Sequence, residues 1–376
     1  MFGKRITLFK LLGFEVGIDW SWIIIAILIA WSLSTGLFPM YYENLSTQMY
    51  WIMGIVGALG LFLSIIIHEF SHSLVARKYG MPVKGITLFI FGGVAQMEEE
   101  PTSPRAEFMM AIVGPISSFA IGLIFYGIYL SGKQGGLPEP VNGVVGYLAL
   151  INVILAGFNI LPAFPLDGGR VLRSILWGVK KNLRWATRVS SWIGSGFGIL
   201  LIVLGVFNVL RGNFIGGMWW FLIGMFLNGA AKSTYQQLIT RKALEGEPVR
   251  KLMKTDPVTV PASLSLKELV EDYIYRHHHK MFPVTEDSDK LAGCITTKQL
   301  KDVPKEQWDQ TRVQDMVVQC SPENTIESKE DAMKALSRMR SSSSSRLMVV
   351  EGGRLVGIIS LKDMLEHLSL KTELEQ

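Results

Sequence analysis

Long uncharged stretches alternate with short charged connections over the first 240 residues. These stretches lie at about 20–42, 44–67, 108–132, 143–166, 189–210 and 212–231, and the second continues as an apolar helix to about residue 76. Each stretch is long enough to cross about 30 Å of hydrocarbon as a helix. The pattern therefore predicts six transmembrane helices within residues 1–240.

The pattern changes near residue 241, where charged residues become frequent. Residues 1–240 contain 16 Lys/Arg and 10 Asp/Glu, whereas residues 241–376 contain 21 and 22. A mean hydropathy of +0.31 thus averages two unlike parts. We predict a membrane domain at 1–240 and a soluble domain at 241–376.

The soluble part contains an internal duplication. Its two units lie at about 248–306 and 311–370, and Met253 corresponds to Met316 as Gly293 does to Gly357. In each unit, short apolar runs typical of strands alternate with amphipathic helical segments, in the order strand, helix, strand, turn, strand, helix. This order predicts an α/β domain built from two repeats.

The positive charges predict the orientation in the membrane. Lys and Arg gather before the first span, in the connection at 165–188 and after the last span, while the intervening connections carry few. Because cytoplasmic connections are enriched in Lys and Arg, we expect both termini and the soluble domain in the cytoplasm of a multi-pass plasma (inner) membrane protein. The net charge of +5 reflects this loop asymmetry, so no nucleic-acid partner is expected. Cys294 and Cys320 lack paired spacing and are expected to be reduced.

The candidate chemistry lies in the segment SIIIHEFSHSLVARKYG of the second span. His68 and His72 are the two histidines of the membrane part, and Glu69 stands between them. Residues four apart share a helix face, so both imidazoles can bind one Zn²⁺ while Glu69 acts as a base on water. The alternative is a histidine pair satisfied by hydrogen bonds within the helix bundle. Three ionisable residues within a span favour the functional reading.

A catalytic zinc requires a third protein ligand, and the membrane part offers carboxylates alone for it. Glu43 and Glu139 fall on the outer side, Glu15 and Asp19 precede the first span, and the run at 98–100 resembles a solvated patch. Asp167 is favoured because it follows a span that Pro162 and Pro165 interrupt, and irregular backbone at membrane depth lines a cavity or is buried in protein. The alternative is that Asp167 caps the helix beginning at Gly168 or Gly169.

Three segments together resemble a known family. HEFSH within an apolar span, GPISS at 114–118 and FNILPAFPLDGGR at 158–170 are similar to the signature segments of the site-2 protease family of intramembrane zinc metalloproteases, and the resemblance covers residues 1 to about 235. It implies that His68, His72 and Asp167 bind zinc and that Glu69 is the general base. It also implies that Asn159 helps to hold the substrate backbone, and that a transmembrane substrate is cut near its cytoplasmic end.

Two further segments of the membrane domain leave alternatives open. Residues 81–101 are rich in β-branched and aromatic residues around Gly92 and Gly93, which predicts a membrane-associated β-hairpin. The hairpin either captures an unwound substrate by β-augmentation or is a plain connector. Gly114 and Pro115 are typical of a helix kink, and we assign them no chemistry.

The soluble repeats resemble a tandem pair of CBS domains. In that family the cleft between modules often holds an adenine nucleotide, and Ser360 and Asp363 match the part that contacts ribose and phosphate. The first repeat departs from the pattern, with Gln299 at the position of the acidic residue. A dimerising module without ligand is the alternative.

Together these features predict a polytopic α-helical membrane protein with a cytoplasmic tandem CBS domain. The predicted activity is that of a zinc endopeptidase acting on single-span proteins in the lipid bilayer, modulated by the CBS pair, which also suggests a homodimer. The alternative is a CBS-regulated ion transporter or channel, since buried His, Glu and Asp can form a conduction path. The polar groups converge on one locus instead of following several spans, which favours the peptidase.

Overall fold

The computed structural model describes residues 6–81, 83–89, 92–97, 101–285 and 291–374. The chain divides into two compact units, Met1–Gln236 and Gln237–Gln376, and each is described by itself. The acidic run at 98–100 and the basic residues at 4 and 5 lie outside the described residues.

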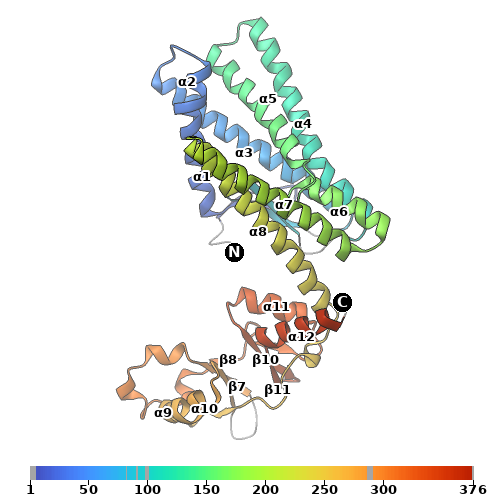
Figure 1. The fold of residues 1–376 in the computed structure, drawn as a ribbon. Coiled ribbons are helices and arrows are strands. Elements are labelled where there is room, and N and C mark those ends of the chain that lie inside the picture. Colours follow the sequence, from blue (N-terminus) through green and yellow to red (C-terminus); the bar gives the residue numbers. More distant parts are fainter. Residues whose placement is uncertain (1–5, 82, 90–91, 98–100, 286–290, 375–376) are drawn as a thin grey trace. The chain divides into compact units, whose positions relative to one another are not determined.

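The first unit is built from long helices and one small sheet (Figure 1). Its helices are α1 (Trp20–Ser32), the π-helical turn η1 (Leu33–Leu37), α2 (Phe38–Tyr41), α3 (Thr47–Lys78), α4 (Pro104–Gly135), α5 (Glu139–Asn159), α6 (Asp167–Lys180), α7 (Leu183–Leu210) and α8 (Phe214–Leu244), the last of which ends in the second unit.

Five helical segments of the described chain are long and apolar enough to cross a membrane. They are Trp20–Tyr41, Thr47–Lys78, Pro104–Gly135, Glu139–Asn159 and Leu183–Leu210. This agrees with a multi-pass membrane protein. The sixth predicted span falls on α8, and its crossing stays a prediction.

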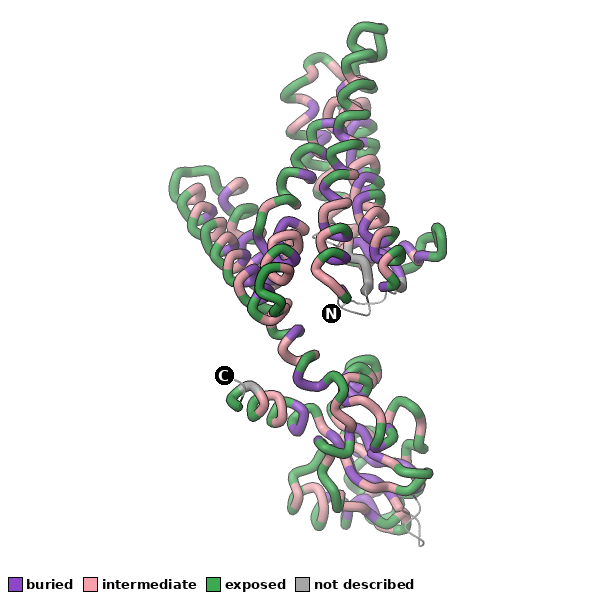
Figure 2. Tube along the Cα trace, turned by 90° about the vertical axis from the view of Figure 1, so that its right-hand side faces the viewer, coloured by how far each residue is buried: buried purple, intermediate pink, exposed green. Residues whose placement is uncertain are grey.

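Buried and exposed residues alternate along the helices of this unit (Figure 2). A cluster that includes Phe38, Met53, Phe62 and Leu148 packs α2, α3 and α5 together. Many large apolar side chains elsewhere on the helices are exposed, for example Ile27 at 63%. Exposed apolar surface on this scale fits helices whose outer faces contact hydrocarbon.

The sheet of the first unit has the strand order β1-β2-β3-β4. Its strands are β1 (Ile6–Leu11), β2 (Phe14–Ile18), β3 (Val83–Phe89) and β4 (Gly92–Met97). β3 and β4 pair antiparallel at the place where the sequence predicts a hairpin, and β2 pairs in parallel with β3. The sequence did not predict β1 and β2. Association of the hairpin with the membrane stays a prediction.

Loop 12–13 and the neighbouring strand are fastened to the end of α3. Arg77 donates a hydrogen bond to the carbonyl oxygen of Leu12 over 2.7 Å, and its guanidinium lies 4.5 Å from the Phe14 ring centroid. The Phe14 ring in turn meets the Phe70 ring edge to face. The sheet is therefore held against the helix that carries the two histidines.

The second unit contains two small sheets, with orders β5-β6-β7-β8 and β11-β10-β9. Its strands are β5 (Val260–Pro261), β6 (Met281–Thr285), β7 (Leu291–Thr296), β8 (Val318–Gln319), β9 (Thr325–Glu327), β10 (Arg346–Glu351) and β11 (Arg354–Ser360). Its helices are η2 (Val249–Lys251), α9 (Leu266–Glu268), η3 (Leu269–Ile274), α10 (Tyr275–His277), η4 (Gln299–Asp302), η5 (Lys305–Gln307), η6 (Val313–Met316), α11 (Ala332–Ser341) and α12 (Leu361–Leu374).

The two repeats exchange backbone pairs. β8 lies in the second repeat and pairs with β7 of the first. In the other direction, Lys254 of the first repeat forms a β-bridge with Ile358 in β11 of the second. After its strand β7 the first repeat has the short 3-10 helix η4, whereas the second repeat has the longer α12 after β11.

Candidate metal centre

His68 and His72 lie one helical turn apart on the buried face of α3. Their exposed fractions are 4% and 5%. Glu69 is half-buried on the same turn. The i,i+4 spacing brings both Nε2 atoms to the same side, 3.1 Å apart.

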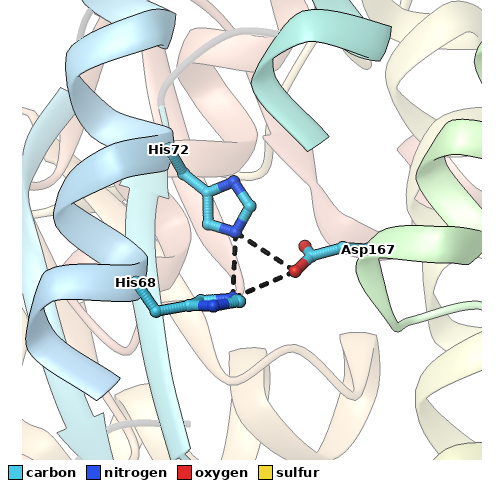
Figure 3. Close-up of side chains that lie close together, drawn as sticks. All are labelled: His68, His72 and Asp167. Atoms are coloured by element: carbon cyan, nitrogen blue, oxygen red, sulfur yellow. Dashed lines mark hydrogen bonds and ion pairs between the residues drawn. The ribbon is translucent and has the colours of Figure 1, made fainter. Parts of the chain in front are cut away.

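Asp167 completes a cluster of three potential metal ligands (Figure 3). Its Oδ2 atom lies 3.0 Å from His68 Nε2 and 3.2 Å from His72 Nε2. Tetrahedral zinc with bonds of about 2.0–2.1 Å separates its ligand atoms by about 3.3 Å. Two imidazole nitrogens and one carboxylate oxygen at 3.0–3.2 Å are therefore a donor set that fits zinc.

The loop between α5 and α6 delivers Asp167 to this cluster. Asp167 is the first residue of α6, and the N-cap is Leu166, which makes no side-chain capping bond. A Cβ atom at Gly168 would lie 2.0 Å from the carbonyl oxygen of Ile160, so a residue without a side chain is required where the loop folds back. The alternative of Asp167 as a helix cap is wrong, because its carboxylate faces the imidazoles.

The second nitrogen of each imidazole has a buried partner on α4. His72 Nδ1 lies 2.6 Å from the carbonyl oxygen of Met110, and His68 Nδ1 lies 2.9 Å from Ser118 Oγ. A carbonyl only accepts, so His72 carries a proton on Nδ1 and leaves Nε2 for the metal in its neutral form. Neither partner was predicted from the sequence, because a backbone carbonyl has no sequence signal and serine is common in transmembrane helices.

Gly114 of the GPISS segment lies against both rings. A Cβ atom there would be 2.2 Å from His72 Nε2 and 2.8 Å from His68 Cε1, well inside van der Waals contact. We assigned this glycine no chemistry from the sequence. The structure gives it a steric role, because any side chain would occupy the space of the imidazoles.

Glu69 lies against the backbone of β4. A Cβ atom at Gly93 would be 2.5 Å from Glu69 Cγ and 3.3 Å from Glu69 Oε1. β4 is the terminal strand of its sheet. The terminal strand of the sheet therefore lies directly beside the candidate base.

Asn159 and Glu107 are the other two residues of the membrane domain that the sequence left as candidates, for substrate binding and for metal binding. Asn159 is the last residue of α5 and is half-buried, directly before Ile160, whose carbonyl packs on Gly168. Its role in substrate binding stays a prediction. Glu107, an acidic residue that the sequence did not eliminate as a ligand, forms a buried ion pair with Arg173 of α6.

In the CBS pair, Asp363 lies at the start of α12 and is 8% exposed. Its Oδ2 accepts hydrogen bonds from the backbone N–H and the hydroxyl of Ser360, at 2.9 and 2.5 Å, and its Oδ1 lies 3.4 Å from Lys254 Nζ. Gln299 accepts in the same way from Thr296 in the first repeat. Ser360 directly precedes α12, and its hydroxyl also accepts a hydrogen bond from the Asp363 N–H at 3.2 Å, so the two residues form a capping box at the start of the helix. Nucleotide binding at Ser360 and Asp363 stays a prediction.

Comparison with known proteins agrees with this site. The model of peptidase family M50 matches residues 56–141 and 137–204, and the CBS domain model matches 249–306 and 314–370. Rip3 of Mycobacterium tuberculosis is 32% identical over 96% of this chain and 91% of its own length. Zinc metalloprotease MJ0392 of Methanocaldococcus jannaschii is 30% identical over 98% of both chains. The solved site-2 protease from the same archaeon is 30% identical, covers 61% of this chain and 94% of its own, and gives a TM-score of 0.43.

Two buried histidines with an intervening glutamate and an aspartate as the third potential ligand, in an apolar helix bundle, fit a membrane zinc metalloprotease. The chain belongs to peptidase family M50, the site-2 proteases, and carries two CBS domains. The matches of the membrane part give no support to the transporter alternative.

Proposed function

We propose that this protein cleaves single-span membrane proteins within their transmembrane segments, close to the cytoplasmic side. The observation that carries the proposal is the convergence of His68, His72 and Asp167 near the C-terminal end of the apolar helix α3, with Glu69 beside the terminal strand of the sheet. Polar groups that converge on one locus suit local bond cleavage better than conduction along a path.

In this proposal His68, His72 and Asp167 hold the zinc ion. When bound, zinc supplies a Lewis acid that polarises the scissile carbonyl and makes water more acidic. Glu69 removes a proton from the attacking water and returns it to the leaving amide nitrogen. The buried imidazoles and the apolar surroundings exclude bulk water, which strengthens these interactions.

Substrate presentation is assigned to the edge of β4. A transmembrane helix hides its peptide bonds in internal hydrogen bonds, so the segment to be cut must unwind first. An unwound segment can pair with a terminal strand by β-augmentation. Because Gly93 of β4 lies against Glu69, a segment paired there would run past the base. Asn159 is proposed to help hold the substrate backbone.

The proposed location is the plasma (inner) membrane, with both termini and the CBS pair in the cytoplasm. The concentration of Lys and Arg at 165–188 and after the last span supports this orientation. The CBS pair is proposed to modulate the peptidase by binding an adenine nucleotide at Ser360 and Asp363, and to support a homodimer.

The test is co-expression with a panel of epitope-tagged single-span proteins. Wild type is compared with Glu69→Gln and with Glu139→Gln, a control at an exposed glutamate of α5. We expect a shortened product with wild type and with the control, and none with Glu69→Gln. Equal product from all three proteins would exclude the proposed activity.

A further inference from the structure

One face of α4 contacts the residues that we propose as zinc ligands. Met110, Gly114 and Ser118 are spaced four apart, so they form one stripe along the helix. The carbonyl oxygen of Met110 bonds His72 Nδ1, and the hydroxyl of Ser118 bonds His68 Nδ1. Gly114, between them, packs against both imidazole rings. Met110 and Ser118 are fully buried, at 0% exposure.

The same helix, α4, is also linked to Asp167, the third proposed ligand, through α6. Glu107, three residues before Met110 on α4, pairs with Arg173, and their side chains are 0% and 2% exposed. Arg173 also lies over the Phe164 ring, with its guanidinium carbon 5.2 Å from the centroid. Phe164 belongs to the loop that leads into Asp167. The ion pair therefore ties both the loop and the helix of Asp167 to α4.

We propose that α4 positions the metal centre, and that Ser118 is the positioning residue for His68. This inference shares one assumption with the proposed function, namely that His68, His72 and Asp167 bind zinc. His72 is aligned by a backbone carbonyl that no substitution removes, whereas the alignment of His68 depends on one hydroxyl. The hydroxyl oxygen accepts a hydrogen bond from Nδ1–H, which keeps the proton on Nδ1 and leaves Nε2 free for the metal, as orienting partners of zinc-bound histidines do.

The experiment measures zinc affinity of the full-length, detergent-purified chain by competition with a chelator. Ser118→Ala is compared with wild type and with Ser117→Ala, because the Ser117 hydroxyl donates to the carbonyl oxygen of Gly114 in its own helix, at 2.7 Å, and not to an imidazole. Losing an orienting partner typically weakens metal binding about 10–100-fold. We expect this loss for Ser118→Ala, no change for Ser117→Ala and recovery in Ser118→Thr, which keeps the hydroxyl.

A second readout separates alignment from a general loss of structure. With Co²⁺ in place of zinc, the visible absorption of the metal reports on ligand geometry, and we expect a changed spectrum for Ser118→Ala alone. If the zinc affinity and the Co²⁺ spectrum of Ser118→Ala match those of Ser117→Ala, Ser118 does not position His68.

The link to Asp167 is tested with the double variant Glu107→Leu/Arg173→Met, which replaces the ion pair by apolar side chains and leaves no buried charge behind. We expect weaker zinc binding without loss of the folded state. Zinc binding equal to wild type would show that the pair does not position Asp167. A wild type that binds zinc and cleaves nothing would refute the proposed function and leave this inference standing.

Discussion

The steric role of Gly114 makes a sharp prediction for Gly114→Ala. The added Cβ atom would lie 2.2 Å from His72 Nε2 and 2.4 Å from its Cε1. Ordinary contacts require about 3.5 Å, so the imidazole must retreat by roughly 1.3 Å. The ring has little room, because Met110 holds its Nδ1 over 2.6 Å.

A displacement of this size exceeds the tolerance of a metal site, where ligands must be held within about 0.5 Å. We expect Gly114→Ala to lose stoichiometric zinc, and cleavage to fall by about 100-fold or more, as misplacements of about 1 Å do. Zinc is measured by elemental analysis of the purified protein, and cleavage by immunoblotting of a tagged substrate.

Gly127→Ala is the matched control. Gly127 lies on the same helix, and a Cβ atom there would meet nothing within 4 Å. The control should keep zinc and activity, which excludes a general effect of alanine in α4. If Gly114→Ala binds one zinc ion as tightly as Gly127→Ala does, the steric argument is refuted.

Four further outcomes are expected. Gly93→Ala should keep zinc but lose cleavage by about 100-fold or more, because its Cβ would displace Glu69; cleavage at the wild-type rate would show that Glu69 does not depend on this contact. Asp167→Ala should lose both zinc and cleavage, whereas Glu69→Gln should keep zinc; stoichiometric zinc in Asp167→Ala would mean that the third ligand was misassigned. Burial raises the pKa of the Cys294 thiol to about 11, whereas Cys320 is exposed. Because alkylation proceeds through the thiolate, iodoacetamide at pH 8 should modify Cys320 and spare Cys294 until the protein unfolds, and equal labelling by mass spectrometry would contradict this. Asp363→Asn should abolish binding of adenine nucleotide to the full chain in calorimetry, and an unchanged affinity would place any nucleotide elsewhere.

Much of the site follows from local sequence. The spacing of His68 and His72 requires only a helix, and the prolines before Asp167 mark irregular backbone at membrane depth. The structure brings these three side chains together, as the sequence predicted.

The surroundings of the site were harder to predict. Ser118 bonds a residue 50 positions away, and the ion pair of Glu107 with Arg173 joins residues 66 apart. Such contacts depend on how helices pack, which a single sequence does not encode locally. β1 was not predicted because apolar and polar residues do not alternate regularly along it. That alternation is the sequence signal of a half-buried strand.

The exchange of backbone pairs between the CBS repeats limits how the soluble part can be divided. The sequence shows two similar units, yet a fragment ending at residue 306 would lack the β8 partner of β7, and a fragment starting at 314 would lack the Lys254 bridge to β11. Each half would expose unpaired strand edge, which favours aggregation. We therefore expect the two repeats to fold together as one unit, so that a stable fragment of the soluble part must contain both.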